Sequence, residues 1–597
     1  MELLNLDGVI EKGVFEIPSY QRGYAWQKEQ LKDFWNDLEH VSKLGDKFHY
    51  MHSLILRELE NEFEDSAFEI IDGQQRLATS LILLGLLAKI TQNKDPKYSP
   101  INLEPVLSYK YYGLNEAFRA IMEEEKDLER FQTSFYAKNL IEAYEFFQEK
   151  ISDTPMETLE KMFDALIKKM LFSVVELNDN RIDPFSSFET INNRGKDLST
   201  LELLKNRLHF VVHKICDEGD LENLQQEIND TYTRIYHDLR FFEDTHLGDF
   251  LKYFVAYYYG EKRDFKERLL NTAFDAHKKY DDLYDEYEKI NDLLLYLSYS
   301  SKVWYFLHTL DDEELRIEIT PKMRGLLDKM RRLNALSTNA FLPLLLSLLT
   351  IQLAVRSGSE RHYTTKELEG LLEYLERFGF LIYGVAGKNT AKNEWIELAF
   401  EAFRAFRYGE ENIVIEKLPT LEKSFFNRQG NSALELLEES IHSKKNAEKW
   451  YQWGKALNYL LYEYELHHNP ETTLNFDSSL ESIEHILPQK PDQGYSTKEK
   501  NWAKNPHIVH ALGNLLLIPK NANSSLSNNP FEEKRKQYLK GSYSEKEVAK
   551  NASFGVVQIK ERSEKLLDSL IARYRIAELV GESAIKAFKN ALLKDIE

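Results

Sequence analysis

The chain has 597 residues, of which 43% are hydrophobic, and its 33 Tyr and 34 Phe exclude a wholly disordered protein. Its one cysteine, Cys216, excludes an internal disulfide and any zinc site that needs several cysteines. The net charge of −21 counts against nucleic acid as a partner, but residues 441–597 hold 23 Lys and Arg against 20 Asp and Glu, so the acidic excess lies elsewhere.

The sequence predicts neither a signal peptide nor a membrane-spanning helix. The start, MELLNLDGVIEKG, lacks the basic and then apolar pattern of a signal peptide. The longest mostly apolar run, 340–355, is too short to span a bilayer and is interrupted by Pro343, Ser347 and Gln352. We therefore expect a soluble cytoplasmic protein with no membrane partner.

Residues 1–215 mix short apolar, strand-like runs with helical patterns. The runs lie at 53–56, 68–71 and 171–175, each near a polar cluster that resembles a turn. This texture predicts a compact α/β or α+β domain.

Three polar motifs stand out in this region: PSYQRGYAW at 18–26, IIDGQQRL at 70–77 and FETINNRGKDLS at 188–199. The third ends in a capping box formed by Ser199 and Glu202, which needs no functional explanation.

The second motif is the most informative, because it predicts a strand, an Asp-Gly turn and a helix. A helix N-terminus offers free N–H groups to an anion, Gly73 permits close backbone approach, and Arg76 can grip phosphate with two hydrogen bonds. The alternative is that Asp72 is only the helix N-cap and Arg76 a surface charge. Spacing alone leaves the two interpretations even.

Residues 216–440 are predicted to be mainly helical, with no chemical constellation. Apolar and aromatic residues recur at three- and four-residue spacing in three segments, at 221–239, 281–297 and 366–380. Further on, His467 and His468 are adjacent. Because neighbouring residues point in different directions, we interpret them as a surface pair and not as a metal clamp.

The segment 441–597 carries the chemistry. IEHILP at 483–488 predicts a short strand that ends at Pro488, and Asn514 introduces the apolar run 515–518. Asn523 follows nine residues after Asn514, and 531–538 is predicted to be a helix. Further helices at 557–574 and 583–593 are expected to pack around this part.

These residue types suit a ββα-metal nuclease. A neutral imidazole, His485, can act as general base, and Mg²⁺ can take a carboxylate oxygen from Glu484 and an amide oxygen from Asn523. Adjacent residues of a strand face opposite ways, but at a strand end both side chains can border one cleft. Asn514 can tie the connecting loop by side-chain hydrogen bonds and so orient His485.

Lys534, Arg535 and Lys536 follow this constellation on the predicted helix. They can contact DNA backbone phosphates, or they can form a solvated helix face balanced by Glu532 and Glu533. The sequence leaves both interpretations open.

The series Glu-His-Ile-Leu-Pro-Gln, Asn514 and Asn523 resembles the HNH nuclease pattern. Its wider context, EHILPQ…LGNLLLIPKNANSSLSNNPFEEKRKQY, resembles the C-terminal domain of GmrSD-type, modification-dependent (type IV) restriction endonucleases. The resemblance implies metal ligation by Glu484 and Asn523 and a general base at His485. Asn528 replaces Asn523 if the Asn-rich loop is aligned differently.

The three N-terminal motifs, in this order, resemble the N-terminal domain of the same proteins, which has a ParB/sulfiredoxin-like fold. The resemblance implies that residues of all three motifs bind NTP. They are Arg22 of the first motif, Asp72, Gly73, Gln74, Gln75 and Arg76 of the second, and Arg194 of the third. It also implies a DNA-sensing surface with Tyr20, Gln21 and Tyr24. One departure is His52, which stands where family members often have a small Gly-Ser and would crowd the turn.

We therefore predict an α+β, predominantly helical protein: a ParB-like nucleotide-binding domain at 1–215, a helical connecting domain at 216–440 and an HNH nuclease domain at 441–597. The expected function is NTP-regulated cleavage of modified phage DNA with Mg²⁺ or Mn²⁺, in antiviral defence. The family implies glucosylated hydroxymethylcytosine or, in SspE-like relatives, phosphorothioate DNA. The alternative is a nucleotide-dependent DNA sensor or NTPase with an inactive nuclease module. A homodimer is left open.

Overall fold

The computed structural model divides the chain into two compact units, Met1–Arg316 with Leu346–Ser357 (the first unit) and Ile317–Leu345 with Gly358–Glu597 (the second unit). The segment 216–440, predicted as one helical domain, is thus shared between the two units. The described residues are 2–19, 21–59, 66–92, 95–111, 113–177, 199–216, 218–275, 283–313, 315–333, 339–355, 363–385, 387, 389–411, 413–427, 450–475, 480–594 and 596.

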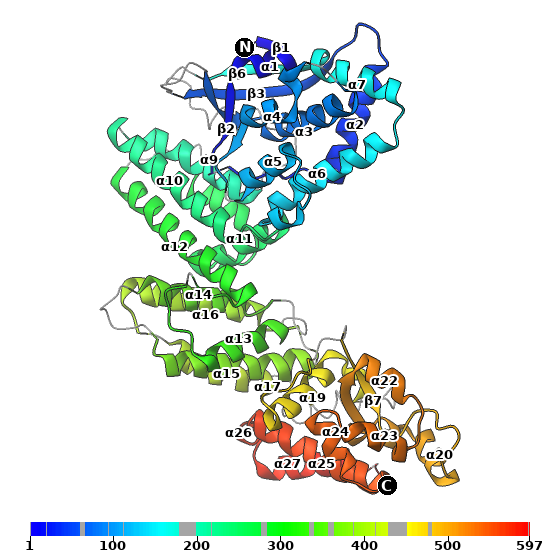
Figure 1. Cartoon of the computed structure of the whole chain (residues 1–597). Coiled ribbons are helices and arrows are strands. Elements are labelled where there is room, and N and C mark those ends of the chain that lie inside the picture. The colour runs from blue at the N-terminus through cyan, green and yellow to red at the C-terminus, as the bar shows by residue number, and fades with distance from the viewer. Residues whose placement is uncertain are drawn as a thin grey trace. The chain divides into compact units, whose positions relative to one another are not determined.

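The first unit contains a six-stranded mixed sheet with the order β1-β6-β3-β4-β2-β5 (Figure 1). The strands are β1 (Glu2–Asn5), β2 (Val14–Ile17), β3 (His49–Leu59), β4 (Ala67–Asp72), β5 (Leu107–Tyr109) and β6 (Met170–Glu176). β6 runs parallel to β3, and β4 runs antiparallel to β3. The strands expected at 53–56, 68–71 and 171–175 lie within β3, β4 and β6, so these three predictions are confirmed.

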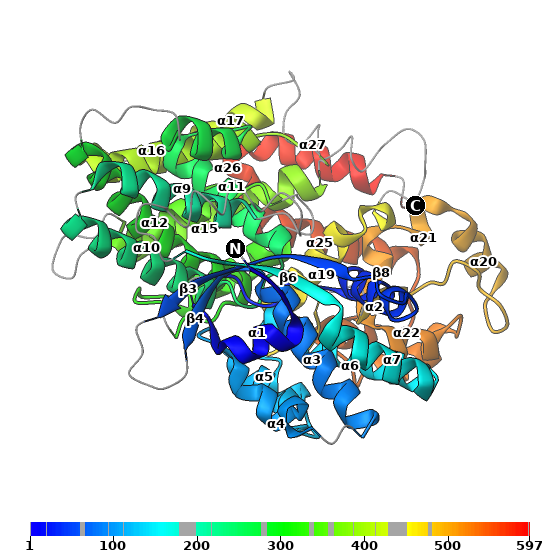
Figure 2. The same ribbon diagram turned by 90° about the horizontal axis from the view of Figure 1, so that it is seen from above.

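Helices surround this sheet and continue beyond it. They are α1 (Leu6–Lys12), α2 (Lys28–Ser42), α3 (Gln74–Ile90), α4 (Pro100–Leu103), α5 (Leu114–Met122), α6 (Phe135–Ser152), α7 (Met156–Lys168), α9 (Thr200–Ile215), α10 (Glu218–Asp238), α11 (Asp244–Tyr259) and α12 (Leu283–Thr309). Helix α3 packs against α6 and α7 (Figure 2), and most of its residues are buried. A helix that is apolar all round belongs in a core, so the position of its first residues is firmly set.

The second unit is largely helical, with one two-stranded antiparallel sheet of β7 (Glu481–His485) and β8 (Leu515–Pro519). Its helices are α13 (Pro321–Leu333), α15 (Thr365–Phe378), α16 (Lys392–Tyr408), α17 (Val414–Asn427), α19 (Lys455–His468), α20 (Thr497–Lys504), α21 (Pro506–Val509), α22 (Lys520–Leu526), α23 (Phe531–Tyr538), α24 (Tyr543–Ala549), α25 (Val556–Arg573), α26 (Ile576–Val580) and α27 (Glu582–Leu593). The predicted helix at 531–538 matches α23, whereas β7 ends three residues before Pro488, where its strand was expected to end.

The apolar run at 340–355 forms α14 (Leu342–Ala354), which is 13 residues long. Across the described ranges, no helix has both the length and the apolar character needed to cross a membrane.

Candidate functional site

The candidate site is built on β7, β8 and α22. The register of the antiparallel pair sets Glu484 opposite Leu516 and His485 opposite Leu515. Helix α22 starts directly after β8 and brings Asn523 back to β7, where its Nδ2 donates to Ser482 Oγ (2.8 Å) and to the Ile483 carbonyl (3.2 Å). The short chain between β8 and Asn523 therefore fixes the amide beside the strand.

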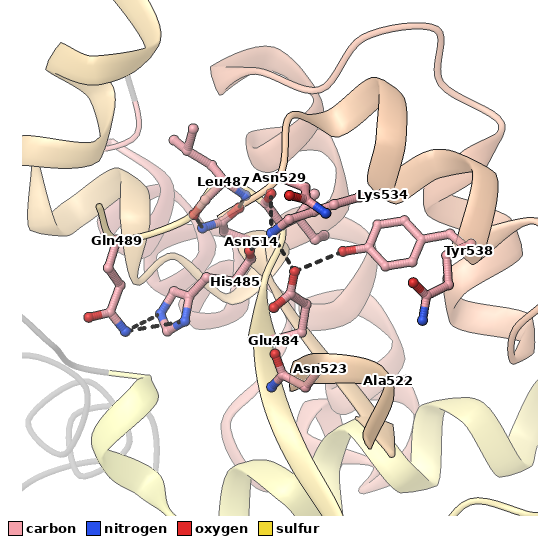
Figure 3. Close-up of polar contacts among 12 residues, drawn as sticks. Glu484, His485, Leu487, Gln489, Asn514, Ala522, Asn523, Asn529, Lys534 and Tyr538 are labelled. Atoms are coloured by element: carbon pink, nitrogen blue, oxygen red, sulfur yellow. Dashed lines mark hydrogen bonds and ion pairs between the residues drawn. The ribbon is translucent and has the colours of Figure 1, made fainter. Parts of the chain in front are cut away.

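Glu484 and Asn523 lie next to each other on one side of β7 (Figure 3). The buried Glu484 carboxylate receives hydrogen bonds at Oε1 from Lys534 Nζ (2.5 Å) and from the Tyr538 hydroxyl (3.1 Å). No described side chain donates to Glu484 Oε2 or to Asn523 Oδ1, and the His485 backbone N–H is a further hydrogen-bond donor to the Glu484 carboxylate. These two oxygens are thus the atoms of the pair that can accept a ligand.

Burial governs the charge of the ion pair between Glu484 and Lys534. Desolvation raises the pKa of the Glu484 carboxyl, and the Lys534 ammonium opposes that rise. Desolvation likewise lowers the pKa of Lys534, and the Glu484 carboxylate opposes that fall. Each group is the main compensation for the buried charge of the other.

At this place the described part of the protein offers a divalent cation only two ligand oxygens, one from Glu484 and one from Asn523. Among the described residues, no group of three or more His, Cys, Asp or Glu side chains is arranged to hold a metal ion. Mg²⁺ needs fewer protein ligands, because it keeps several waters and is commonly held by one or two carboxylates together with substrate phosphate. Glu484 Oε2 and Asn523 Oδ1 would be its protein ligands. The exposed Asn528 is less suited to this role than Asn523, which contacts β7.

His485 points to the opposite side of β7 from Glu484 (Figure 3). Its Nε2 lies 3.1 Å from His510 Nδ1, and its Nδ1 lies 3.3 Å from the amide nitrogen of Gln489, whose side chain is exposed. The Tyr451 ring lies 4.9 Å from the imidazole, centre to centre. The structure thus separates the predicted base from the predicted metal ligands by the width of the strand.

Burial, the nearby His510 and the Lys534 ammonium lower the pKa of His485 to about 3. The ring is therefore neutral at physiological pH and able to accept a proton, but a pKa this far below the working pH makes it a weak base. If its Nε2–H donates to His510 Nδ1, the lone pair is on Nδ1, which lies slightly nearer the Gln489 amide nitrogen (3.3 Å) than Nε2 does (3.5 Å).

Asn514 joins the two ends of the loop between β7 and β8. Its side chain is fully buried, accepts from Leu487 N (2.8 Å) and donates to the carbonyls of Leu487 (3.0 Å) and Val509 (2.7 Å). The backbone carbonyl of Asn514 accepts a hydrogen bond from Ile486 N at 3.0 Å. These bonds fix the chain immediately after His485.

Gly513 lets this loop approach α25. A Cβ at position 513 would lie 2.0 Å from the Ile559 carbonyl, and Gly513 N donates to Ser563 Oγ at 2.8 Å. Arg562 adds hydrogen bonds to the carbonyls of Gly513 (2.9 Å) and Leu515 (2.8 Å). Helix α25 thus supports the loop that carries Asn514.

The structure corrects the expected DNA contact of Lys534. The Lys534 side chain is 0% exposed and all its hydrogen bonds go to β7 and the residue after it, so it cannot reach a backbone phosphate. Arg535 is half-buried, and its Nε donates to the Ala549 carbonyl at 2.8 Å. Lys536 on the same helix is exposed. Of the three basic residues on this helix, Lys534 and Arg535 therefore bind other parts of the protein, and Lys536 is exposed to solvent.

In the first unit, the glutamines of the first two motifs bind the motifs to each other. Gln75 Oε1 accepts from Ala25 N (2.8 Å), and its Nε2 donates to the Gly23 carbonyl (3.0 Å). Gln74 Nε2 donates to the Arg22 carbonyl (3.2 Å), and Gln21 Nε2 donates to the Ile70 carbonyl (2.8 Å). Much of the hydrogen-bonding capacity of these amides is thus used within the protein.

The turn between β4 and α3 contains the acid and the arginine of the second motif. Arg76 donates to Asp72 Oδ2 (3.1 Å) and to the Ser53 carbonyl (2.9 Å). The alternative that Asp72 caps the helix is wrong, because the N-cap is Gly73, at φ 100°. A Cβ at Gly73 would lie 3.0 Å from the Ser53 carbonyl, so a larger residue would be strained there.

The other residues singled out in the N-terminal region have different outcomes. Arg22 pairs with Glu202 (Nε to Oε1, 3.1 Å), the same glutamate that completes the capping box with Ser199. Tyr24 was expected on a DNA-sensing surface, but this is wrong, because its ring is fully buried and its hydroxyl lies 2.6 Å from Thr79 Oγ1. Tyr20 and Arg194 lie outside the described residues. His52 lies within β3 and has a positive φ of 63°, beside a register irregularity between Tyr50 and Ser53; the crowding expected there stays a prediction.

His510, Tyr538 and the role of Gln489 were not predicted from the sequence. His510 has a weak signal, since it is a histidine in an apolar loop four residues before Asn514. Tyr538 follows Lys534 by four residues, the spacing that places two side chains on one helix face. Neither signal identifies its partner, because both partners are distant in sequence.

Two segments of the chain match family models. Residues 3–209 match the model described as GmrSD restriction endonuclease, N-terminal domain, and residues 437–569 match the model described as GmrSD restriction endonucleases, C-terminal domain. No curated protein matches the chain.

Proposed function

The chain belongs to the GmrSD restriction endonuclease family and is thus a DNA endonuclease of restriction, and we propose that it cuts DNA at an HNH-type site around Glu484, His485 and Asn523. One observation carries this proposal. At the end of β7, Glu484 and Asn523, whose oxygens could bind a cation, lie together on one side of the strand, and the imidazole of His485 lies on the other.

In-line hydrolysis of a phosphodiester places the attacking water and the leaving oxygen on opposite sides of phosphorus. A base and a cation on two sides of a strand end suit this geometry, provided that the phosphate lies across that end. His485 Nδ1 would take the proton from water, after the exposed Gln489 amide moves aside. Mg²⁺ or Mn²⁺, held by Glu484 and Asn523, would stabilise the charge that develops on the phosphate. Asn514 holds the chain after His485 and so keeps the ring in place.

The test is His485→Ala in the full-length protein, assayed with Mg²⁺ or Mn²⁺ on unmodified, glucosylated, methylated and phosphorothioate DNA. We expect cleavage to fall by about 10²–10⁴-fold, the usual contribution of a positioned general base. His468→Ala is the matched control, because His468 is an exposed histidine at the end of α19. Cleavage that persists unchanged in His485→Ala would defeat the site assignment.

We also propose that the first unit, with a ParB-like fold, binds NTP near Asp72, Gly73, Gln74 and Arg76, with Gln75 and Arg22 holding the site and Arg194 added by the third motif. The start of α3 offers N–H groups to a phosphate. Within the described part of the chain, Gln74 Oε1 is buried and has no hydrogen-bond partner, so it can receive a donor from a ligand. Arg76→Ala should remove the effect of NTP on cleavage while basal cleavage persists.

The second candidate function is a nucleotide-dependent sensor of modified DNA with an inactive nuclease module. It is favoured by the burial of His485, because a ring whose pKa is lowered to about 3 is a weak base. NTP binding without a nick in any DNA of the panel would support this second function and contradict the first.

A further inference from the structure

The ammonium of Lys534 is a cation enclosed in the candidate site. Its side chain is 0% exposed, and Nζ donates to Glu484 Oε1 (2.5 Å), to the His485 carbonyl (2.9 Å) and, at longer range, to the Ile486 carbonyl (3.4 Å). An ammonium has three N–H donors, and here each has an acceptor. Burying an unpaired ammonium is strongly unfavourable, so this set of acceptors is what allows Lys534 to lie inside the protein.

Helix α23 directs two side chains at the same carboxylate oxygen. Tyr538 follows Lys534 by one turn, and its hydroxyl also donates to Glu484 Oε1, at 3.1 Å. Both donors therefore approach from the helix side, away from Asn523 (Figure 3). Held in this way, the carboxylate keeps its other oxygen, Oε2, for a ligand on the Asn523 side.

Lys534 also fixes the strand end itself. The carbonyls of His485 and Ile486 flank the point where β7 stops, and both accept from Nζ. One buried side chain thus holds the backbone of the predicted base and the carboxylate of the predicted metal ligand in one arrangement.

We propose that Lys534 is a positioning residue for the metal site, and that it binds Glu484 Oε1 so that Oε2 and Asn523 Oδ1 are presented together to a divalent cation. This inference rests on the proposed function. It assigns Lys534 a role in binding the cation and none in contacting DNA. The charge of Lys534 also balances the buried Glu484 when no cation is bound, so the metal-free site keeps its shape.

The experiment measures Mn²⁺ binding to the full-length protein without DNA, by electron paramagnetic resonance of the free ion. Partners that orient metal-bound carboxylates typically account for about 10–100-fold in metal affinity, so we expect Lys534→Met to raise the Kd for Mn²⁺ by that factor. Lys536→Met is the matched control, because Lys536 lies on the same helix and is exposed. It should leave the Kd unchanged.

Two further variants keep the result interpretable. Tyr538→Phe removes one hydrogen bond to Oε1 but keeps the buried ring, so it should raise the Kd several-fold even if Lys534→Met fails to fold. Glu484→Gln tests whether the cation is bound at this site at all. Circular dichroism in EDTA reports whether each variant is folded.

The positioning role and the metal site are distinguished by different results. If wild-type protein binds Mn²⁺ and Glu484→Gln does not, but the folded Lys534→Met and Tyr538→Phe variants bind as tightly as wild type, the positioning role is overturned. If wild type binds no Mn²⁺, or Glu484→Gln leaves binding intact, the metal site of the proposed function is overturned, and the positioning role with it.

Discussion

At the scale of single residues, the pair of His485 and His510 decides which nitrogen can act as a base. The two rings share one hydrogen bond, between His485 Nε2 and His510 Nδ1 at 3.1 Å, and both side chains are buried. For His485 Nδ1 to accept a proton from water, His485 Nε2 must keep its own proton and donate it to His510. The second histidine thus selects the tautomer of the first.

This role of His510 predicts a graded series of variants. His510→Leu removes the acceptor and should lower kcat by about 10–100-fold with little change in KM, which is part of what a positioned base contributes. His510→Asn can accept the same hydrogen bond through its amide oxygen and should retain most of the activity. Steady-state cleavage kinetics measure kcat for both variants. If kcat falls equally in His510→Leu and His510→Asn, the His510 ring matters only for packing.

Burial is what the residue-level predictions lacked. Lys534 and Tyr24 have the residue types of a DNA-binding surface, yet each is buried and hydrogen-bonded within the protein. A sequence gives the chemistry of a side chain and its face on a helix, but the depth of that face depends on which other segments cover it.

At the scale of elements, the turn between β4 and α3 depends on one glycine. Gly73 has a φ of 100°, and a Cβ there would meet the Ser53 carbonyl and the Leu54 side chain at 3.0 Å. The rest of the second motif is held by the start of α3, so a shift of this turn would displace Arg76.

Gly73→Ala should therefore destabilise the first unit by about 1–3 kcal/mol, the usual cost of a strained backbone conformation. Gly248→Ala is the matched control, because Gly248 lies inside α11 and a Cβ added there would have nothing within 4 Å, so the change should stabilise by about 0.5–1 kcal/mol. Chemical denaturation measures both. Equal effects of the two substitutions would contradict the requirement for a left-handed turn.

Most elements were predictable because their patterns are local. The strands β3, β4 and β6 and the helix α23 follow from apolar runs bounded by polar turns and from helical spacing. The sequence predicted that β7 ends at Pro488, but its pairing with β8 stops at His485. The proline marks only how far the chain can stay extended, and not where the pairing between the strands ends.

At the scale of the whole molecule, the chain has two compact units, each with its own buried core. The second motif lies in the first unit, and the candidate nuclease site lies in the second. We therefore expect calorimetry to show two unfolding transitions. Mn²⁺ at 100 times its Kd should stabilise the second unit by about 2.7 kcal/mol and so raise the midpoint temperature of its transition. Gly73→Ala should lower the midpoint temperature of the transition of the first unit. A single transition that responds to both would contradict this division.

The sequence by itself determined the types and order of the motifs, the membership of both ends in one family, and the local strands and helices. These follow from residue chemistry and from short periodic patterns, which are properties of neighbouring residues. Only the tertiary structure decided that His510 binds the catalytic candidate and that Lys534 is enclosed. Those facts join residues 25 to 50 positions apart, and only the packing of the chain brings such residues into contact.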